Sequence, residues 1–425
     1  MKPRAMLGIG VAIVLALVLN GFLNAAPIEI EFGNPFRFEK QELLEALIAE
    51  FNASQDEIRV INLPMGPSTE YDQKLVTLFV AGMAPHVVWG TPQTLANYIY
   101  MDAVVPIDAF LEKDPDLAKE DFLPALIMEL TMPDGRLVGI PFENSNVGLL
   151  YNIHPFEEVG AMTPAEYAAR DNWTWETFIE AMRKVTRDFD GDGQIDQHGF
   201  LIEHYSYLWF TPLLWQNGGA FYTPDFRASG LDSPAAIEAA EFFAAQVHDY
   251  GIARRGPASI TTGEVVMRSD LTLNIPAYQE LGYIETAPLP EKVTKATVST
   301  SKALGISRND PAVMEAAWTF IKWLVADERF IEGWLIPAGY LPVTNSGVYY
   351  PVYSEYLAST PLLYPYIMQL PYARKTPILP SPDIQTEGLD DLLLELIIHG
   401  DVSPAAGMRA IAEHTNAKIR AWLGK

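Results

Sequence analysis

One short acidic loop, DFDGDGQID, has the residue types and the spacing to bind a metal ion. Oxygen-bearing side chains occupy every second position in it: Asp188, Asp190, Asp192, Gln194 and Asp196. In an extended chain with glycine joints, such side chains turn toward one centre, as the oxygen ligands of Ca²⁺ do. The spacing matches positions 1, 3, 5, 7 and 9 of an EF-hand loop, in which a glycine makes the sharp turn. The sequence therefore predicts a structural Ca²⁺ site in this loop.

The match to an EF-hand stops before the end of that loop. Position 12 normally holds a bidentate Glu, and here it is Gly199. The segment that follows, HGFLIEHYSYLWF, is typical of a strand or a loop rather than of an exiting helix. A complete EF-hand is therefore not expected. The alternative to a metal site is a polar turn in which the aspartates accept hydrogen bonds from their own backbone.

The sequence lacks the common signatures of catalysis. It contains no G-x-S-x-G, H-E-x-x-H, P-loop or G-x-G-x-x-G motif. It has no Cys for thiolate chemistry, and its seven His stand singly. We therefore predict that the chain is not an enzyme. Two alternatives stay open: a secreted glycoside hydrolase or lyase, since 54 acidic residues can supply a carboxylate pair, and a Ca²⁺-stabilised adhesin.

Composition and charge describe a globular protein with small ligands. The 425 residues are sufficient for two or three domains, and 49% of them are hydrophobic while 20% are charged. The formal net charge of -25 repels phosphate backbones and anionic lipid. Nucleic acid is therefore excluded as an expected partner, and neutral or cationic small ligands are favoured.

The N-terminus has the pattern of a signal peptide. Lys2 and Arg4 precede an apolar run over 5–19, which is shorter than the ~20 residues of a membrane-spanning helix. We therefore predict a signal peptide over 1–26 and an exported, periplasmic protein. The alternative is retention as an uncleaved anchor, because apolar residues resume at 21–22. Since the sequence has no Cys, it offers no disulfide and no lipobox for a lipid anchor.

Strand and helix signals alternate along the chain, as in an α/β fold. Strand patterns cover 28–32 and 58–63, helical periodicity covers 44–51 and 71–81, and the strand HVVW then ends at Trp89. Right-handed crossovers make such a βαβαβ unit a parallel sheet. In open parallel sheets, the ligand crevice lies beyond the carboxyl ends of the strands. The sequence therefore predicts an α/β fold with a ligand cleft near Trp89.

The acidic loop belongs to a longer unit, WTWETFIEAMRKVTRDFDGDGQIDQHGF, which combines a tryptophan, an amphipathic helix, the turn and a strand. This unit resembles an element of the extracellular solute-binding proteins of bacterial ABC importers, of the carbohydrate-binding, maltose-binding-protein-like type. Further segments resemble that family in the family's own order, with His86 in place of its usual Asp: VAGMAPHVVWG, DGRLVGIPFENSNVGLLYN, QNGGAFY, TGEVVM, LGISRND, GYLPV and HGDVSPAAGMRAIAEHTNAKI. Each segment alone is a weak signal, but their order over nearly the whole chain is a strong one.

The resemblance implies a two-lobed fold with a mixed, mainly parallel sheet flanked by helices in each lobe and a ligand cleft at the hinge. The first lobe would take 27–141 with a return over 270–326. The second lobe would take 142–269, and 327–425 would supply its own return and the C-terminal helices. A monomer of this kind would bind a sugar or oligosaccharide and deliver it to the permease subunits of an ABC importer in the membrane.

A sugar cleft needs aromatic rings for the C–H faces of the ligand and carboxylates or amides for its hydroxyls. By position and resemblance, we expect the ligand to contact Trp89, Glu143, Asn144, Trp209, Trp215, Gln216, Asp270, Gly339 and Tyr340. Four further tryptophans lie in or beside helix faces and are interpreted as packing residues: Trp173, Trp175, Trp318 and Trp323.

Overall fold

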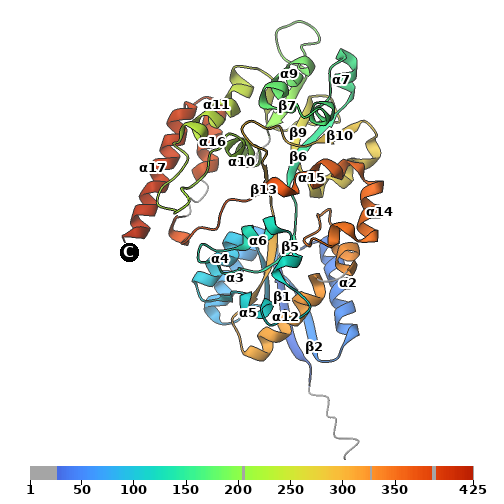
Figure 1. The fold of residues 1–425 in the computed structure, drawn as a ribbon, viewed down its shortest axis with the longest axis vertical. Coiled ribbons are helices and arrows are strands. Elements are labelled where there is room, and N and C mark those ends of the chain that lie inside the picture. The colour runs from blue at the N-terminus through green and yellow to red at the C-terminus, as the bar shows by residue number, and fades with distance from the viewer. Residues whose placement is uncertain (1–25, 203–205, 326–327, 385–388, 425) are drawn as a thin grey trace, which may run out of the picture.

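The computed structural model describes residues 26–202, 206–325, 328–384 and 389–424, which form two lobes joined at a waist (Figure 1). This two-lobed α/β architecture confirms the predicted fold class. The predicted signal peptide, 1–26, lies outside the described residues except for its last position. Among the helices that are described, none is long and apolar enough to cross a membrane.

The first lobe is built on a six-stranded mixed sheet. Its strands are β1 (Ile28–Asn34), β2 (Ile58–Pro64), β3 (Val87–Gly90), β4 (Val104–Val105), β5 (Ile140–Glu143) and β12 (Lys302–Ser307). β1 lies parallel to both β2 and β3, which confirms the predicted βαβαβ unit. β12 returns from far along the chain and pairs antiparallel with β3, β4 and β5.

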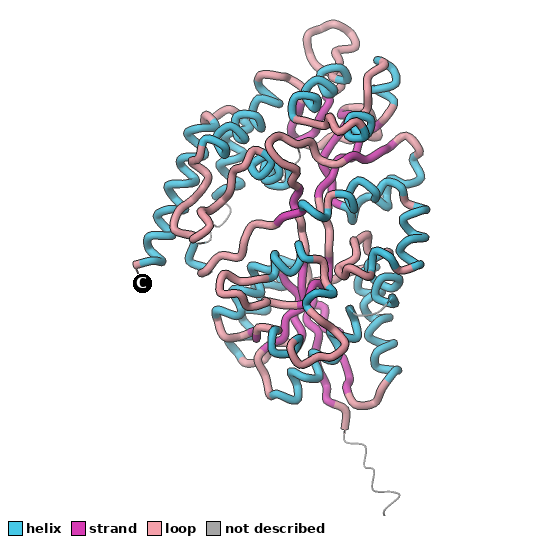
Figure 2. The backbone as a smooth tube through the Cα atoms, in the orientation of Figure 1, coloured by secondary structure: helices cyan, strands magenta, loops and turns pink. Residues whose placement is uncertain are grey.

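Helices flank this sheet on both sides (Figure 2). They are α2 (Glu39–Ser54), α3 (Ser68–Ala81), α4 (Pro92–Tyr100), α5 (Asp108–Leu111), α6 (Pro124–Leu130) and α12 (Pro311–Val325). α2 buries the apolar stripe from Leu44 to Phe51 that its periodicity predicts. α4 begins where the Thr91 hydroxyl accepts a hydrogen bond from the Thr94 N–H, with Pro92 in the first helical position.

The second lobe has a five-stranded sheet in the order β10-β6-β9-β7-β8. These strands are β6 (Val147–Asn152), β7 (His198–Ile202), β8 (Ala253–Arg255), β9 (Val265–Leu271) and β10 (Ile284–Ala287). Its helices are α7 (His154–Val159), α8 (Pro164–Ala169), α9 (Trp175–Val185), α10 (Ser206–Gln216), α11 (Pro234–His248), α15 (Tyr364–Met368), α16 (Leu389–His399) and α17 (Pro404–Leu423). Thr174 caps α9, and Ser403 with Pro404 opens α17.

The structure moves the predicted boundaries of the return to the first lobe. β9 and β10 both pair with β6, so the chain from 270 to 287 belongs to the second lobe. The return begins with β12, at Lys302, and extends beyond 326, because Trp334 and Tyr353 are buried in the core of the first lobe. Strand pairing over a long sequence separation decides these boundaries, and local patterns do not report it.

Extended segments of the chain run side by side through the waist (Figure 2). Segment 144–146 connects β5 to β6, and segment 299–301 connects β11 (Thr297–Val298) to β12. The Thr300 N–H donates to the Ser145 carbonyl at 2.8 Å, so the two segments form a short ribbon. β13 (Ala373–Arg374) pairs with β11 beside them. Between the lobes, the backbone is thus hydrogen-bonded across separate parts of the sequence.

Trp209 lies at the centre of the core of the second lobe. It is 1% exposed, its ring centroid lies 4.6 Å from that of Phe200, and its Nε1 donates to Gln246 Oε1 at 3.0 Å. Removal of so large a buried side chain leaves a cavity that a packed interior closes only in part.

We expect Trp209→Ala to lower the free energy of unfolding by about 3–5 kcal/mol, because the large buried ring is lost. Chemical denaturation followed by circular dichroism measures this change. Tyr349→Ala is the matched control, since Tyr349 is 82% exposed, and its effect should stay within about 0.5 kcal/mol. A similar stability for the two variants would contradict the assignment of Trp209 to the core.

Candidate functional site at the waist

The edge of the first sheet that faces the waist gathers polar and aromatic side chains. β3 and β5 end at this edge, and β12 begins there because it runs antiparallel to both. Trp89 therefore lies near the end of β3, Glu143 at the end of β5, and Lys302 at the start of β12, in register with Glu143. Carboxyl ends of parallel strands are where open α/β sheets bind ligands.

Glu143 is the centre of this group and is only 3% exposed. Its burial raises the pKa of the carboxyl group, while the ammonium groups of Lys40 and Lys302 act in the opposite direction. Lys40 Nζ donates to the Tyr340 hydroxyl at 2.6 Å and lies 4.4 Å from the centroid of that ring. Lys302 Nζ lies 5.8 Å from the centroid of Trp89. We call these five residues the waist cluster.

Burial shifts the lysines of the waist cluster as well. It lowers the pKa of Lys40 and of Lys302, and the Glu143 carboxylate partly restores both. The pKa of Tyr340 is raised, first by burial and then by the charge of Glu143. The hydroxyl of Tyr340 therefore stays protonated and available for hydrogen bonds.

Asp72, near the start of α3, adds a second carboxylate at this edge. Burial raises its pKa, and the charge of Lys302 lowers it. Together with the waist cluster, the edge holds two lysines, two carboxylates and two aromatic rings. Such a set suits a polar ligand whose hydroxyls need both donors and acceptors and whose apolar faces need rings.

The structure brings together three of the residues predicted from the sequence: Trp89, Glu143 and Tyr340. Asn144 follows Glu143 and points elsewhere, since its side-chain amide donates to the Pro342 carbonyl at 2.7 Å. Sequence reasoning missed Lys40 and Lys302. The position of Lys40 could have been noticed, because it lies in the first turn of the helix that follows the first strand. The position of Lys302 depends on the distant pairing of β12.

The remaining predicted contact residues of the second lobe lie in its core, which corrects their assignment to the cleft. Trp209 packs as described above, and Trp215 meets Phe221 edge to face at 6.3 Å. Gln216 is fully buried and accepts a hydrogen bond from Trp175 Nε1 at 2.8 Å. The reason is that α10 is apolar all round, so the spacing of its residues does not identify a face.

Asp270 and Gly339 also serve the fold. Asp270 forms an ion pair with Arg268 at 2.7 Å and accepts a hydrogen bond from the Asn274 amide at 2.6 Å. Gly339 has a φ of +74°, and a Cβ there would lie 2.8 Å from Leu273 Cα. Close backbone approach therefore explains this glycine, and neither residue joins the waist cluster. The four tryptophans assigned to packing lie buried or half-buried, with Trp323 the most accessible.

The acidic loop gathers part of its predicted ligand set. Ligand oxygens of Asp188, Asp190 and Asp196 lie within 4.8 Å of one another, and Asp192 is not part of that group. The Gln194 amide donates to the Asp192 carboxylate at 3.0 Å. The backbone N–H groups of the two loop glycines donate to Asp188 at 2.7 and 2.9 Å, and these bonds lower the pKa of Asp188. The loop thus shows features of both interpretations. It gathers three carboxylates that suit a cation, and it also forms the self-capped turn that was the alternative to a metal site.

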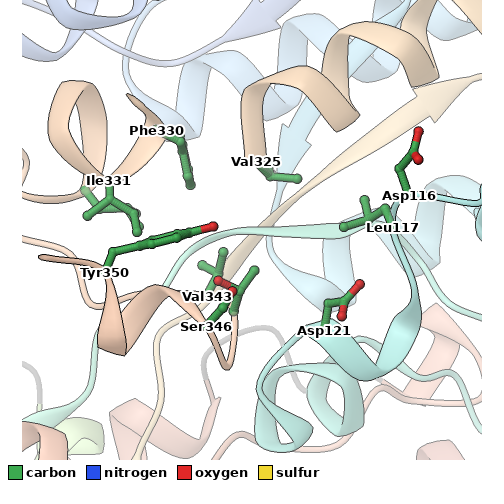
Figure 3. Close-up of a pocket in the computed structure, with 11 residues that line it drawn as sticks. Asp116, Leu117, Asp121, Val325, Phe330, Ile331, Val343, Ser346 and Tyr350 are labelled. Carbon is green, nitrogen blue, oxygen red and sulfur yellow. The ribbon is translucent and has the colours of Figure 1, made fainter. Parts of the chain in front are cut away.

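A separate cavity of about 220 Å³ lies in the first lobe, between segment 116–121 and the part of the chain from 325 to 350 (Figure 3). Phe330 and Tyr350 line one side of it, and Asp121 lies across from them. The Asp121 carboxylate accepts the Ala118 N–H at 2.8 Å, which closes a turn. We assign this cavity to packing between the two parts of the lobe.

The profile of one protein family matches most of the sequence that forms this architecture. That profile, of the bacterial extracellular solute-binding proteins, matches residues 46–357 of the 425-residue chain. The chain belongs to this family. The relationship covers both lobes and the waist between them, and it bears out the family predicted from the sequence motifs.

Curated relatives of this solute-binding protein align over part of their length. The sn-glycerol-3-phosphate-binding periplasmic protein UgpB of Rhizobium meliloti (strain 1021) is 24% identical over 168 residues, which are 39% of this chain and 37% of UgpB. UgpB of Yersinia pestis bv. Antiqua (strain Antiqua) is 27% identical over 217 residues, 49% of this chain and 48% of UgpB. The chain thus spans about half the length, or less, of the curated relatives it matches.

Solved structures share the fold over nearly the whole chain. The sugar-binding protein MalE from Xanthomonas citri superposes with a TM-score of 0.80 at 18% identity, over 93% of this chain and 99% of that one. The cyclic alpha-maltosyl-1,6-maltose binding protein from Arthrobacter globiformis gives a TM-score of 0.78 at 20% identity, over 93% and 100%. UgpB from Mycobacterium tuberculosis, in complex with glycerophosphocholine, gives 0.75 at 18%, over 94% and 100%.

A second buried ion group of the solute-binding protein lies beside the waist cluster. Lys375, next to β13, donates from Nζ to the Ser301 carbonyl at 2.9 Å. The pKa of Lys375 is lowered to about 7, first by burial and then by the charge of Lys302, while the charge of Glu129 opposes both effects. Below pH 7 the folded and unfolded chains both hold this proton, whereas above pH 7 and below the ordinary value of 10.5 only the unfolded chain does.

The free energy of unfolding should therefore rise with pH across that window, because the unfolded state binds more protons. We expect Lys375→Met to flatten the rise by up to about 1.4 kcal/mol per pH unit. Urea denaturation between about pH 7 and 9 measures the slope. Lys74→Met, at an exposed lysine, is the control. If the free energy of unfolding rises equally with pH in the wild type and in Lys375→Met, the pKa of Lys375 is not lowered in the folded protein.

Proposed function

We propose that this protein is the substrate-binding component of an ABC importer, which binds a sugar or oligosaccharide in the interlobe cleft and delivers it to the permease. The observation that carries the proposal is the waist cluster, in which the Trp89 ring lies beside Lys302 and Glu143 at the sheet edge. Family membership supports the same role.

The charges of the site favour a neutral polyhydroxyl ligand. Lys40 and Lys302 oppose Glu143 and Asp72, so the sheet edge carries no large excess of either sign. The rings of Trp89 and Tyr340 supply apolar faces for the C–H surface of a sugar. The structures of similar fold include proteins described as binding a cyclic maltosyl-maltose and cycloalternan, which agrees with an oligosaccharide. Since the waist cluster is suited to recognition, we expect the protein to release its ligand without chemical change.

A second candidate ligand is a phosphate ester such as sn-glycerol 3-phosphate, for which the curated relatives are named. The charge of Lys302 lowers the pKa of Lys375, so the two ammonium groups repel each other. An anion between them would relieve that repulsion. The overall net charge of -25 opposes anion capture, and we therefore place the sugar first.

The cellular setting completes the proposal. An exported, periplasmic monomer that meets a membrane permease agrees with the extracellular family and with relatives named as periplasmic. Ligand binding between the lobes would shift an open ensemble toward a closed one.

We expect soluble sugars to bind stoichiometrically and Trp89→Ala to weaken the best of them by roughly ten- to a hundred-fold, as loss of a stacked ring costs on the order of 1–3 kcal/mol. Calorimetry on folded protein, after a thermal-shift screen of oligosaccharides and glycerol 3-phosphate, measures this. Tyr364→Ala is the control, because Tyr364 is 56% exposed in the other lobe.

Small-angle scattering should show a smaller radius of gyration at saturating ligand, since the lobes close. An unchanged radius, or an unchanged affinity in Trp89→Ala, would count against the cleft at the waist. Release of a cleaved sugar would identify a glycoside hydrolase or lyase instead. Preference for glycerol 3-phosphate over every sugar, with an affinity that falls steeply with salt, would favour the second candidate.

We also propose that the acidic loop holds a structural Ca²⁺ through Asp188, Asp190 and Asp196, whose oxygens the turn already gathers. A chelator should then lower the melting temperature of the wild type, because the ion stabilises only the folded state. Asp190→Ala should lose that sensitivity, while Asp225→Ala, at an exposed aspartate in another turn, should keep it. If the chelator does not change the melting temperature of the wild type, the loop is a self-capped turn without a structural Ca²⁺.

A further inference from the structure

A cavity of about 330 Å³ lies at the waist between α6 and the segment from Leu370 to Ala373. Leucine, proline and alanine side chains make up most of its wall, and Asn144 and Ser299 of the crossing segments close it. Among the described residues that line it, Glu129 is the one titratable group. The cavity is thus an apolar chamber with a single carboxyl group in its wall.

This cavity lies on the other side of the crossing segments from the waist cluster. Glu143 and Asn144 are consecutive residues of extended chain, so their side chains point to opposite faces. Glu143 faces Lys40 and Lys302, whereas Asn144 lines the cavity. Ser301 likewise turns to Glu129, while Lys302 turns to the ring of Trp89.

Glu129 forms part of the wall, and only one of its two carboxyl oxygens accepts hydrogen bonds from the protein. Its Oε2 accepts hydrogen bonds from the hydroxyls of Ser299, at 2.9 Å, and of Ser301. Its Oε1 is buried and has no hydrogen-bond partner among the described residues. Burial raises the pKa of this carboxyl group, whereas the charge of Lys375 and the two serine hydrogen bonds lower it. A buried carboxyl oxygen without a donor is costly to the fold, and a ligand that brings an N–H group removes that cost. Two hydrogen bonds therefore fix the carboxyl group and leave one acceptor for a guest.

We propose that this cavity is a second ligand site, which takes a small cationic amphiphile with its ammonium group on Glu129 Oε1 and its hydrocarbon body against the apolar wall. An ammonium ion gains a charged hydrogen bond where a neutral alcohol gains a weaker one and a carboxylate is repelled. The volume admits on the order of ten non-hydrogen atoms, at the ~30 Å³ that a water molecule occupies in the liquid. A six-membered ring with one amine has this size.

The site does not rest on the sugar proposal, because it shares no lining residue with the waist cluster. Both lobes bound it, however: α6 belongs to the first lobe, and Leu370 to Ala373 lie beside β11 of the second. A guest that spans the waist binds the open and closed forms with different affinities. By linkage, it then changes the affinity of the interlobe cleft.

Cyclohexylammonium, cyclohexanol and cyclohexanecarboxylate form a matched set of probes for calorimetry at about pH 8, where the amine stays charged. We expect the ammonium probe to bind at least tenfold more tightly than the alcohol, and the carboxylate not to bind. Glu129→Gln keeps the shape of the side chain and should weaken the ammonium probe by at least tenfold.

Two tryptophan substitutions on α6 test whether the ammonium probe binds inside the cavity or on the outer surface of the helix. Ala125 lines the cavity, so Ala125→Trp should fill it and abolish binding of the ammonium probe. Met128 is 71% exposed on the same helix, and Met128→Trp should leave binding intact. Trp89→Ala should also bind the probe normally, because the waist cluster lies on the other face.

The proposal is overturned if the wild type does not bind the ammonium probe, or if alcohol and amine bind equally. It is also overturned if Glu129→Gln and Ala125→Trp bind the amine like the wild type, or if Trp89→Ala loses it. That last result would place the amine in the interlobe cleft. A failed sugar screen with normal amine binding would reject the function proposed for the cleft and keep this second site.

Discussion

The pairing of β12 with β3, β4 and β5 is the constraint on which the rest of the structure depends. This strand enters the first sheet after the chain has built a complete second sheet, so the two lobes cannot separate into consecutive domains. Its antiparallel direction brings its first residue, Lys302, to the edge where β3 and β5 end. The same strand thus closes the first lobe, anchors a crossing segment and supplies a cation to the waist cluster.

That edge would be unstable if its charges were buried singly. Desolvation of one carboxylate or one ammonium costs more than a hydrogen bond returns. The waist balances Glu143 with Lys40 and Lys302, and Glu129 with Lys375 and two serine hydroxyls. Such groups contribute less to stability than apolar side chains of equal volume would. Their presence is therefore better explained by recognition than by folding, as perturbed groups at functional sites usually are.

The sequence predicted the fold where local patterns decide it and failed where distant pairing decides it. The βαβαβ unit, the buried stripe of α2 and the strand end at Trp89 all follow from periodicity within short windows. Trp209 was assigned wrongly to the cleft because α10 is apolar all round, so no face of the helix marks the core. Lys302 escaped prediction because its neighbours come from strands far earlier in the chain. Residues that only distant strand pairing brings to the sheet edge therefore cannot be predicted from local spacing.

The same pairing is irregular where it meets the waist. The register of β12 against β5 shifts between Lys302 and Ala303, and such irregularities concentrate twist and weaken the local ladder. On the far side, the two crossing segments are tied to each other by the Thr300 to Ser145 hydrogen bond. The irregularity therefore lies where β12 leaves the waist and enters the first sheet. Because Lys302, Trp89 and Glu143 share that sheet, a rotation of the lobes would move the second lobe relative to all three together.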